Sequence, residues 1–250
     1  MAVLLTLIRR ELAGHFLSMR GYVIMAGIQL ILGGSLLMVL HKLNGLPYDL
    51  PFTEQFPQTQ FFWLVLLLIA PVITMRTFAQ EKATGTFETL LTTPVSDAQV
   101  VLAKFAGSFL FFLIAFLPAL SYPFILEHYA HRPMEVDSRA IISLGIGIGL
   151  FGAFFMALGC FASSLTRSQI VAAMITFAAG TGLYITGYLS DLPPSDPQWW
   201  HHLLRHTSML RHMEDFSTGI LDTRHVLLYL SLTGVFLFLT YKSVESRRWK

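Results

Sequence analysis

Charged residues are scarce in this chain of 250 residues: Asp, Glu, Lys and Arg together make up 13%, whereas apolar residues make up 54%. In water-soluble domains about a quarter of the residues are charged. The deficit therefore indicates that much of the surface faces lipid rather than water. The net charge of +2 and the lack of a basic tract give no reason to expect nucleic acid as a partner.

Cysteine occurs once, at Cys160, within an apolar run. A single cysteine cannot form a disulfide within the chain, and its neighbours predict a small buried side chain. A cleavable signal peptide is also missing from the N-terminal region. The first apolar run, 22–40, is too long for such a signal, and no small-x-small cleavage site follows it. We therefore expect this run to remain in the protein as a membrane span.

Acidic residues are absent from six long apolar segments, and basic residues occur only at their edges. A helix needs about 20 mostly apolar residues to cross a membrane, and a charge at its centre costs about 2.5–3.5 kcal/mol. The segments predict an all-α membrane protein with six transmembrane helices at 22–40, 61–78, 103–126, 140–162, 170–189 and 225–241. Carriers coupled to protons or sodium ions usually place ionisable groups at membrane depth, so that class is disfavoured.

The Lys and Arg residues predict the orientation. Six spans place both termini on one side of the membrane. That side has 11 Lys and Arg residues, and the other side has 6. Because cytoplasmic loops are enriched in positive charge, we expect a multi-pass protein of the inner membrane with both termini in the cytoplasm.

The stretch after the second span is too polar for a membrane helix and too regular for a plain loop. Phe87, Leu90 and Leu91 are spaced as on one face of a short helix, with Glu88 off that face. Pro94 ends this helix, because proline lacks an amide donor. From these residues alone, the helix lies on lipid headgroups or docks into a cytoplasmic partner, with no preference between the two.

The third span has clear signals at both ends. Ser96 followed by Gln99 is the pattern of a capping box, in which each side chain bonds the other residue's backbone amide. Pro118 and Pro123 predict a kink near the far end of the span.

The cytoplasmic stretch contains a recognisable pattern. Its members are Glu81, Gly85, Thr86, Glu88, Leu90, Leu91, Pro94 and Val95, followed by Gln99 and Lys104. In order and spacing they resemble the hallmark of ABC-2-type exporter permeases, E-x-x-x-G-T-x-E-x-L-L-x-x-P-V. The resemblance implies that 79–96 is a coupling segment that docks on a separate ATPase. It assigns this contact to Glu81, Gly85, Thr86, Phe87, Glu88, Leu90, Leu91 and Pro94.

The resemblance extends over nearly the whole chain, which we expect to form a single permease domain, 1–250. It implies a second contact with the ATPase in the turn between spans four and five, at Thr166, Arg167 and Gln169. It also implies that 1–20 forms an interfacial elbow helix. The C-terminal third is similar to the gliding-motility-type branch of the family.

A nucleotide-binding loop is missing. Such a loop has the pattern G-x-x-x-x-G-K-[ST], and the chain contains no Gly-Lys pair. We expect no cofactor in this chain, with ATP and Mg²⁺ bound by the partner ATPase, and no enzymatic activity of its own. The resemblance implies two ATPase copies. It also implies a second permease copy or a related membrane subunit with an outer domain, and contact with membrane lipid.

The longest loop on the outer side, 190–224, is interrupted by prolines and followed by short apolar patterns. The resemblance implies re-entrant helices that close the outer end of a transport pathway. The candidate gate residues are Trp199, Trp200, Met209 and Phe216. Several histidines in this loop have spacing compatible with a metal, but no cysteine or carboxylate pair completes a site, and we expect none.

Alternatives remain. The chain could be a membrane anchor or scaffold for cytoplasmic proteins without transport, or a permease of the copper-site-maturation type. In the fourth span, small residues recur every fourth position at Gly145, Gly149, Ala153 and Ala157. This spacing is typical of close helix packing in lipid, either within the subunit or, less favoured, between two copies.

Overall fold

The computed structural model describes residues 2–43, 51–86, 95–129, 137–190 and 206–246. All regular structure in these ranges is helical, and six of the helices are long and apolar enough to cross a membrane. The predicted all-α class with six spans is thus confirmed. The elements are α1 Ala2–Phe16, α2 Met19–Leu43, α3 Phe52–Gln55, α4 Gln60–Thr74, α5 Ala79–Thr84, α7 Asp97–Phe116, the 3₁₀ helix η1 Leu117–Ser121, α8 Tyr122–Tyr129, α9 Ser138–Leu165, α10 Gln169–Ser190, α12 Met209–Ser217 and α13 Thr223–Glu245.

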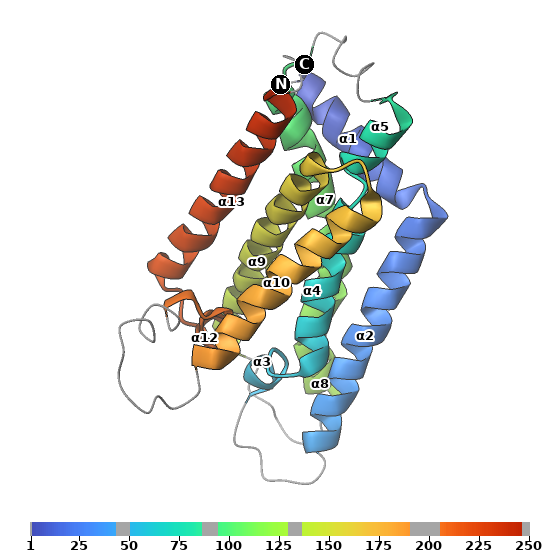
Figure 1. Cartoon of the computed structure of the whole chain (residues 1–250). Helices are drawn as coiled ribbons and strands as arrows, with labels where there is room; N and C mark the ends of the chain where they lie inside the picture. Colours follow the sequence, from blue (N-terminus) through green and yellow to red (C-terminus); the bar gives the residue numbers. More distant parts are fainter. Residues whose placement is uncertain (1, 44–50, 87–94, 130–136, 191–205, 247–250) are drawn as a thin grey trace.

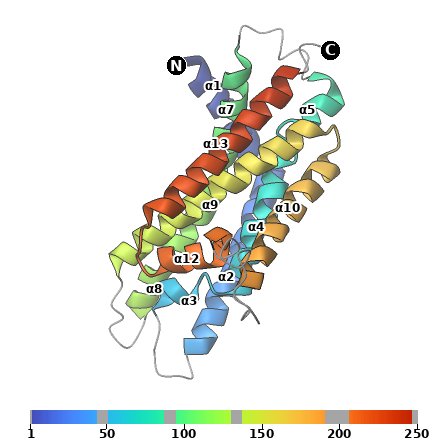
Figure 2. The ribbon, with the colours of Figure 1, turned by 60° about the vertical axis from the view of Figure 1, so that its left-hand side comes forward.

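The span-capable helices form a bundle whose two ends differ. The described parts near the two termini lie at the same end, together with α1 and α5, whereas α3, α8 and α12 lie at the other (Figure 1). More than half of the apolar stretch is buried in α4, α7 and α9, but less than a quarter in α2, α10 and α13. The turned view shows α13 and α10 on either side of α9 (Figure 2). The buried helices are therefore the inner layer, and the other three present their apolar faces to the surroundings.

The start of α7 agrees with its sequence signal. The Ser96 hydroxyl accepts a hydrogen bond from the Gln99 amide at 3.3 Å, and the Gln99 side chain accepts one from the Ser96 amide at 3.2 Å. Both halves of the predicted capping box are present. At the far end the third span changes to a 3₁₀ turn in which Pro118 occupies one of the first positions. The predicted interruption is therefore confirmed there.

The predicted second span, 61–78, lies within the span-capable stretch Gln60–Thr84, but its regular helix is interrupted. The apolar run continued to residue 78, but α4 ends at Thr74, and 75–78 form turns before α5. Two threonines account for this: the Thr74 hydroxyl bonds to the Ala70 carbonyl at 2.6 Å, and the Thr77 hydroxyl bonds to the Thr74 carbonyl at 2.7 Å. Such bonds compete with regular helical pairing, so the chain can turn away here despite its apolar composition.

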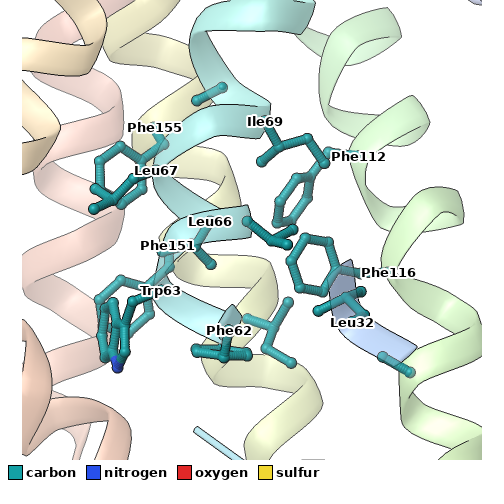
Figure 3. Packing of buried hydrophobic residues seen from close by; sticks show 14 of the residues in the cluster. Leu32, Phe62, Trp63, Leu66, Leu67, Ile69, Phe112, Phe116, Phe151 and Phe155 are labelled. Carbon is teal, nitrogen blue, oxygen red and sulfur yellow. The ribbon is translucent and has the colours of Figure 1, made fainter. Parts of the chain in front are cut away.

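The core between the inner helices is rich in aromatic rings (Figure 3). Phe62 and Trp63 meet edge to face with ring centres 5.6 Å apart, and Phe62 also meets Phe116 of α7 at 6.4 Å. Trp63 reaches Phe151 of α9 at 6.1 Å. Offset and edge-on contacts of this kind add about 0.5–1.5 kcal/mol each beyond the area they bury. They hold α4, α7 and α9 in fixed mutual positions.

The small residues of α9 pack within the subunit. A Cβ at Gly145 would lie 3.5 Å from Leu120, and one at Gly149 would lie 3.9 Å from Leu113. These are ordinary contacts. The closest approaches occur off the predicted stripe, at Gly152 against Phe112 and Gly159 against Thr74, where a Cβ would collide. Cys160 is fully buried beside them, as expected.

Candidate coupling site

Ser163, near the end of α9, fastens the turn that precedes α5. Its hydroxyl accepts hydrogen bonds from the amides of Phe78 and Ala79, both at 3.1 Å, and donates one to the carbonyl of Met75 at 3.2 Å. The first amides of a helix have no partner within it, and Phe78, the residue before α5, provides no side-chain cap. A serine more than eighty positions away in the sequence therefore caps α5.

The neighbouring carbonyl of Ser164 joins three helices. The Lys82 ammonium, which is buried, donates a hydrogen bond to it from α5. The Ser243 hydroxyl of α13 donates another at 3.2 Å. The last carbonyls of a helix are unpaired and carry partial negative charge, which favours a cation there. The C-terminal end of α9 is thus the point to which α5 and α13 are attached.

Lys104 is the most deeply buried charged residue among those described in this region, with only 2% of its surface exposed. Its ammonium lies 2.6 Å from Glu81 Oε1 and 3.5 Å from Glu11 Oε1, and 5.4 Å from the centre of the Phe78 ring. A buried lysine needs carboxylate partners, because its desolvation is costly without them. The ion cluster therefore ties α7 to both α5 and α1.

The α1 helix lies directly on α7. A Cβ at Gly107 would come within 2.7 Å of Glu11 Cβ, so only glycine fits here without a shift. One turn further on, the His15 ring stacks on Phe111 with centres 4.9 Å apart. Burial lowers the pKa of His15 below its ordinary value, and the positive charge of Lys104 adds to this, although Glu11 opposes it. His15 is therefore held neutral beside an aromatic ring.

The residues of the predicted coupling segment divide into two groups. Glu81 lies in the ion cluster, Gly85 ends α5 with a left-handed φ of 75°, and Thr86 is exposed with its hydroxyl 2.9 Å from that of Thr84. Gly85 adopts this φ without the strain that a side chain would impose. The remaining members, Phe87, Glu88, Leu90, Leu91 and Pro94, lie outside the described residues.

The turn between α9 and α10 lies next to α5. Thr166 leaves the helix in an extended conformation, and its hydroxyl accepts a hydrogen bond from the Ser168 amide at 3.0 Å. Arg167 is exposed, and Gln169 begins α10. Lys82 reaches the Ser164 carbonyl, so the two segments predicted to contact an ATPase lie at one end of the bundle (Figure 1). This proximity could not be read from the sequence.

Several residues that hold α5, α1 and α13 in place were not singled out by the sequence. Glu11, Lys82, Ser163 and Ser243 gave no local signal, because each acts through a partner from another helix. Lys104 gave one: it is a lone charge at the edge of an apolar run and needs a counter-ion. The sequence does not say that Glu81 is that counter-ion.

The other end of the bundle contains the candidate gate residues. Met209 and Phe216 of α12 are buried. The Phe216 ring comes within 2.8 Å of the position that a Cβ at Gly147 would occupy. They pack into the core of the described structure rather than lining an open passage. Trp199 and Trp200 lie outside the described residues.

Comparison with known families matches residues 50–241 to the model described as ABC-2 family transporter protein. The match covers most of the chain, including all spans but the first. The comparison with curated proteins gave no match.

Proposed function

The chain belongs to the ABC-2 transporter family, as a multi-pass membrane permease subunit of an ABC transporter, and we propose that the Lys104 cluster transmits the movement of a docked ATPase to its spans. Membership of the family implies an ATP-binding partner. In this proposal the partner docks on the segment 79–96 and on the turn at Thr166, Arg167 and Gln169.

The observation that carries the proposal is the position of α5. This short helix is held by Ser163 and Ser164 of α9 and, through Glu81, by the buried Lys104 of α7. Both α9 and α7 belong to the inner layer of the bundle. A displacement of the residues that follow Gly85 would therefore move α5, and with it two inner spans, instead of being absorbed by a loose loop.

The elbow helix is part of the same proposal. Residues 1–20 form an interfacial element, and Glu11 brings α1 to the same ammonium at 3.5 Å. A movement of the inner ends of α7 and α5 would then carry α1 with it. Leu5 is 66% exposed, as expected for a helix that rests on lipid.

For the location, we propose the inner membrane with both termini cytoplasmic, because Lys and Arg are enriched on the side of the termini. That places α5 and the ion cluster in the cytoplasm, where an ATPase operates. The segment 190–224 would then lie outside and contain re-entrant helices, of which α12 is the described part. Met209 and Phe216, with Trp199 and Trp200, would form its gate.

The complete complex would contain two ATPase copies that bind ATP and Mg²⁺. It would also contain a second permease, either another copy or a related membrane subunit with an outer domain. The C-terminal resemblance favours an exporter of the gliding-motility type. The exposed apolar faces of α2, α10 and α13 are available for lipid or for this second subunit.

The test separates docking from transmission. The tagged chain is purified from its native membrane in mild detergent, and a P-loop ATPase is sought by mass spectrometry. We expect Glu88→Arg to lose the ATPase. We expect Glu81→Gln to retain it but to weaken the stimulation of ATP hydrolysis by the permease. Lys242→Met, at an exposed ion pair with Glu245 at the same end, is the control for both.

The outcomes differ clearly. If the ATPase remains bound to Glu88→Arg, the docking segment is wrong. If Glu81→Gln behaves as Lys242→Met in both assays, docking stands and the proposed route of transmission is wrong. If no ATPase accompanies the unmodified chain in several detergents, a scaffold role replaces the exporter.

A further inference from the structure

At the end of the bundle opposite the termini, α12 lies close to the start of α13 (Figure 2), and a second polar cluster joins these two helices. The rings of His212 and His225 have centres only 3.9 Å apart, with an angle of 33° between their planes. Nδ1 of His212 lies 2.8 Å from the hydroxyl of Tyr229, which is itself 1% exposed. Two imidazoles are thus in contact within a largely buried setting, and nothing in the proposed docking of an ATPase uses them.

The two histidines differ in their surroundings. His212 is 3% exposed, its Nδ1 pairs with the neutral Tyr229 hydroxyl, and the ring also has a hydrogen bond with the backbone of His206. His225 lies nearer the surface, with Nδ1 3.6 Å from the Asp215 carboxylate. That distance is longer than a hydrogen bond, and Nδ1 of His225 has no hydrogen-bond partner among the described residues. A protonated His225 would have a carboxylate facing it, whereas a protonated His212 would face Tyr229 and a second imidazole.

His212, His225 and Tyr229 form the polar half of the contact surface between α12 and the rest of the bundle. The apolar half consists of Met209, Met213 and Phe216, all buried in the core. The Phe216 ring meets His225 edge to face with centres 6.1 Å apart. Because the rings and the apolar side chains share one contact surface, water can reach His212 only if α12 moves away from the bundle.

From this geometry we propose that the His212–His225 pair is a proton-binding site, and that proton uptake by His212 releases α12 from α13 and α9. Two charged imidazoles cannot remain stacked at 3.9 Å in a buried place, because like charges repel strongly at low dielectric. Separation of the helices would let water reach both rings and remove that repulsion.

The titration of His212 agrees in direction. Burial, followed by the nearby His225, lowers its pKa to about 4 from 6.5. Among smaller influences, Asp222 raises the pKa and His206 acts both ways. The docked state therefore favours neutral His212. Docking is strongest above pH 6.5 and is lost progressively as the pH falls from 6.5 towards 4.

Few charged groups on the neighbouring elements could serve as a counter-ion for His212. The described part of α10 contains no acidic or basic side chain, and α3 contributes Glu54. Around α12 and the ends of α9 and α13 the charged or titratable groups are Asp137, Arg139, His206, Arg211, Glu214, Asp215, Asp222, Arg224 and His225. The Asp137 and Asp222 carboxylates accept hydrogen bonds from the backbone amides of Arg139 and Arg224 and so cap α9 and α13. Asp215 faces His225. Each of these three thus has another partner, although Asp222 still raises the pKa of His212 as a smaller influence.

A metal ion is a poorer ligand for this place than a proton. In the described parts of the chain no group of three or more His, Cys, Asp or Glu side chains converges. Nδ1 of His212, moreover, is occupied by Tyr229. The two rings also face each other, whereas metal ligands would direct their nitrogen atoms to a common point.

Hydrogen exchange measured by mass spectrometry tests the proposal on the full chain in lipid nanodiscs. Exchange of the amides of Met209–Ser217 is compared at pH 7.5 and 5.5, after correction for the intrinsic chemical rate. The pKa of His212 is 6.5 when α12 is released and about 4 when it is docked. At pH 5.5, one unit below the released pKa, protection of these amides should therefore be about tenfold lower than at pH 7.5. His212→Asn keeps a hydrogen-bonding group near the position of Nδ1 but cannot be protonated, so its protection should not change with pH.

The control is His41→Asn, an exposed histidine at the same end of the molecule, at the end of α2. It should show the same tenfold change as the unmodified chain. If the protection of Met209–Ser217 in the unmodified chain does not depend on pH, the proposal is wrong. It is also wrong if the protection in His212→Asn falls with pH as much as in the unmodified chain. If that variant does not fold, His212→Gln takes its place, and titration of the unmodified chain down to pH 4.5 remains decisive.

Discussion

Lys104 and Glu81 form an ion pair at 2.6 Å that joins the first half of α7 to α5. The two residues are 23 positions apart, and the exposed fraction of the Lys104 side chain is only 3%. The Glu81 side chain is 23% exposed, so the buried charge is the one on Lys104, and loss of Glu81 would leave that ammonium with only the more distant Glu11. The pair is therefore both a weak point for stability and a rigid connection between the two elements.

Replacement of Lys104 by Met should destabilise the protein by about 1.5–3 kcal/mol, because Glu81 loses a charge-assisted hydrogen bond but is itself only partly buried. Thermal unfolding in detergent, followed by circular dichroism, measures this. Lys242→Met disrupts an exposed pair at the same end and should leave the melting temperature nearly unchanged. Equal melting temperatures for Lys104→Met and Lys242→Met would contradict a stabilising role for the Lys104–Glu81 pair.

Ser163→Ala should loosen α5 without unfolding the bundle. The substitution leaves the amides of Phe78 and Ala79 without their acceptor, and each buried unpaired donor costs about 1–3 kcal/mol. Hydrogen exchange in 78–84 should accelerate, whereas exchange in α4 should not. Ser231→Ala, which removes an exposed hydroxyl from α13, is the matched control. Slow exchange in 78–84 of the Ser163 variant would show that α5 does not depend on this cap.

Gly107→Val should separate α1 from α7. Even a Cβ at this position lies 2.7 Å from Glu11 Cβ, and the nearby Leu12 amide is at 3.4 Å. Overpacking of this kind costs about 1–3 kcal/mol. The measurement is the distance between spin labels at Arg9 and Leu102, both exposed, which should increase. Gly182→Val, where nothing lies within 4 Å, is the control and should leave the distance unchanged.

The contact of α1 with α7 should also weaken in acid. Burial lowers the pKa of His15 below 6.5, so the docked helix prefers the neutral ring. Docking is complete above pH 6.5 and is lost as the pH falls through the lowered value. The same pair of spin labels should report a longer distance at pH 5 than at pH 7.5. His15→Phe keeps a ring against Phe111 and should remove the change; persistence of the change in this variant would exclude His15 as its origin.

Local and periodic features could be predicted from the sequence. The spans follow from length and apolar composition, and the start of α7 follows from Ser96 and Gln99, which are three residues apart. The interruption at Pro118 follows from one residue's covalent structure. In each case the physical cause lies within a few residues of the effect.

Contacts between distant segments could not be predicted in the same way. Ser163 caps α5 from 84 positions beyond Ala79, and its neighbours give no hint of that partner. The turns after α4 were not predicted, because the apolar run continues past Thr74 and Thr77, whose hydroxyls bond to backbone carbonyls there. The tight glycines of α9, Gly152 and Gly159, depend on which neighbouring side chains face them. A spacing rule within one helix contains no such information.

The cap on α5 also affects how the protein is made. Ser163 follows Ala79 by 84 residues, so at a synthesis rate of about 5–20 residues per second it emerges roughly 4–17 s later. During that interval α2, α4 and α7 can enter the membrane, but α5 lacks the hydroxyl that holds it. Biogenesis therefore has an order: in a nascent chain or fragment that ends before α9, the amides of Phe78 and Ala79 lack the acceptor that Ser163 provides.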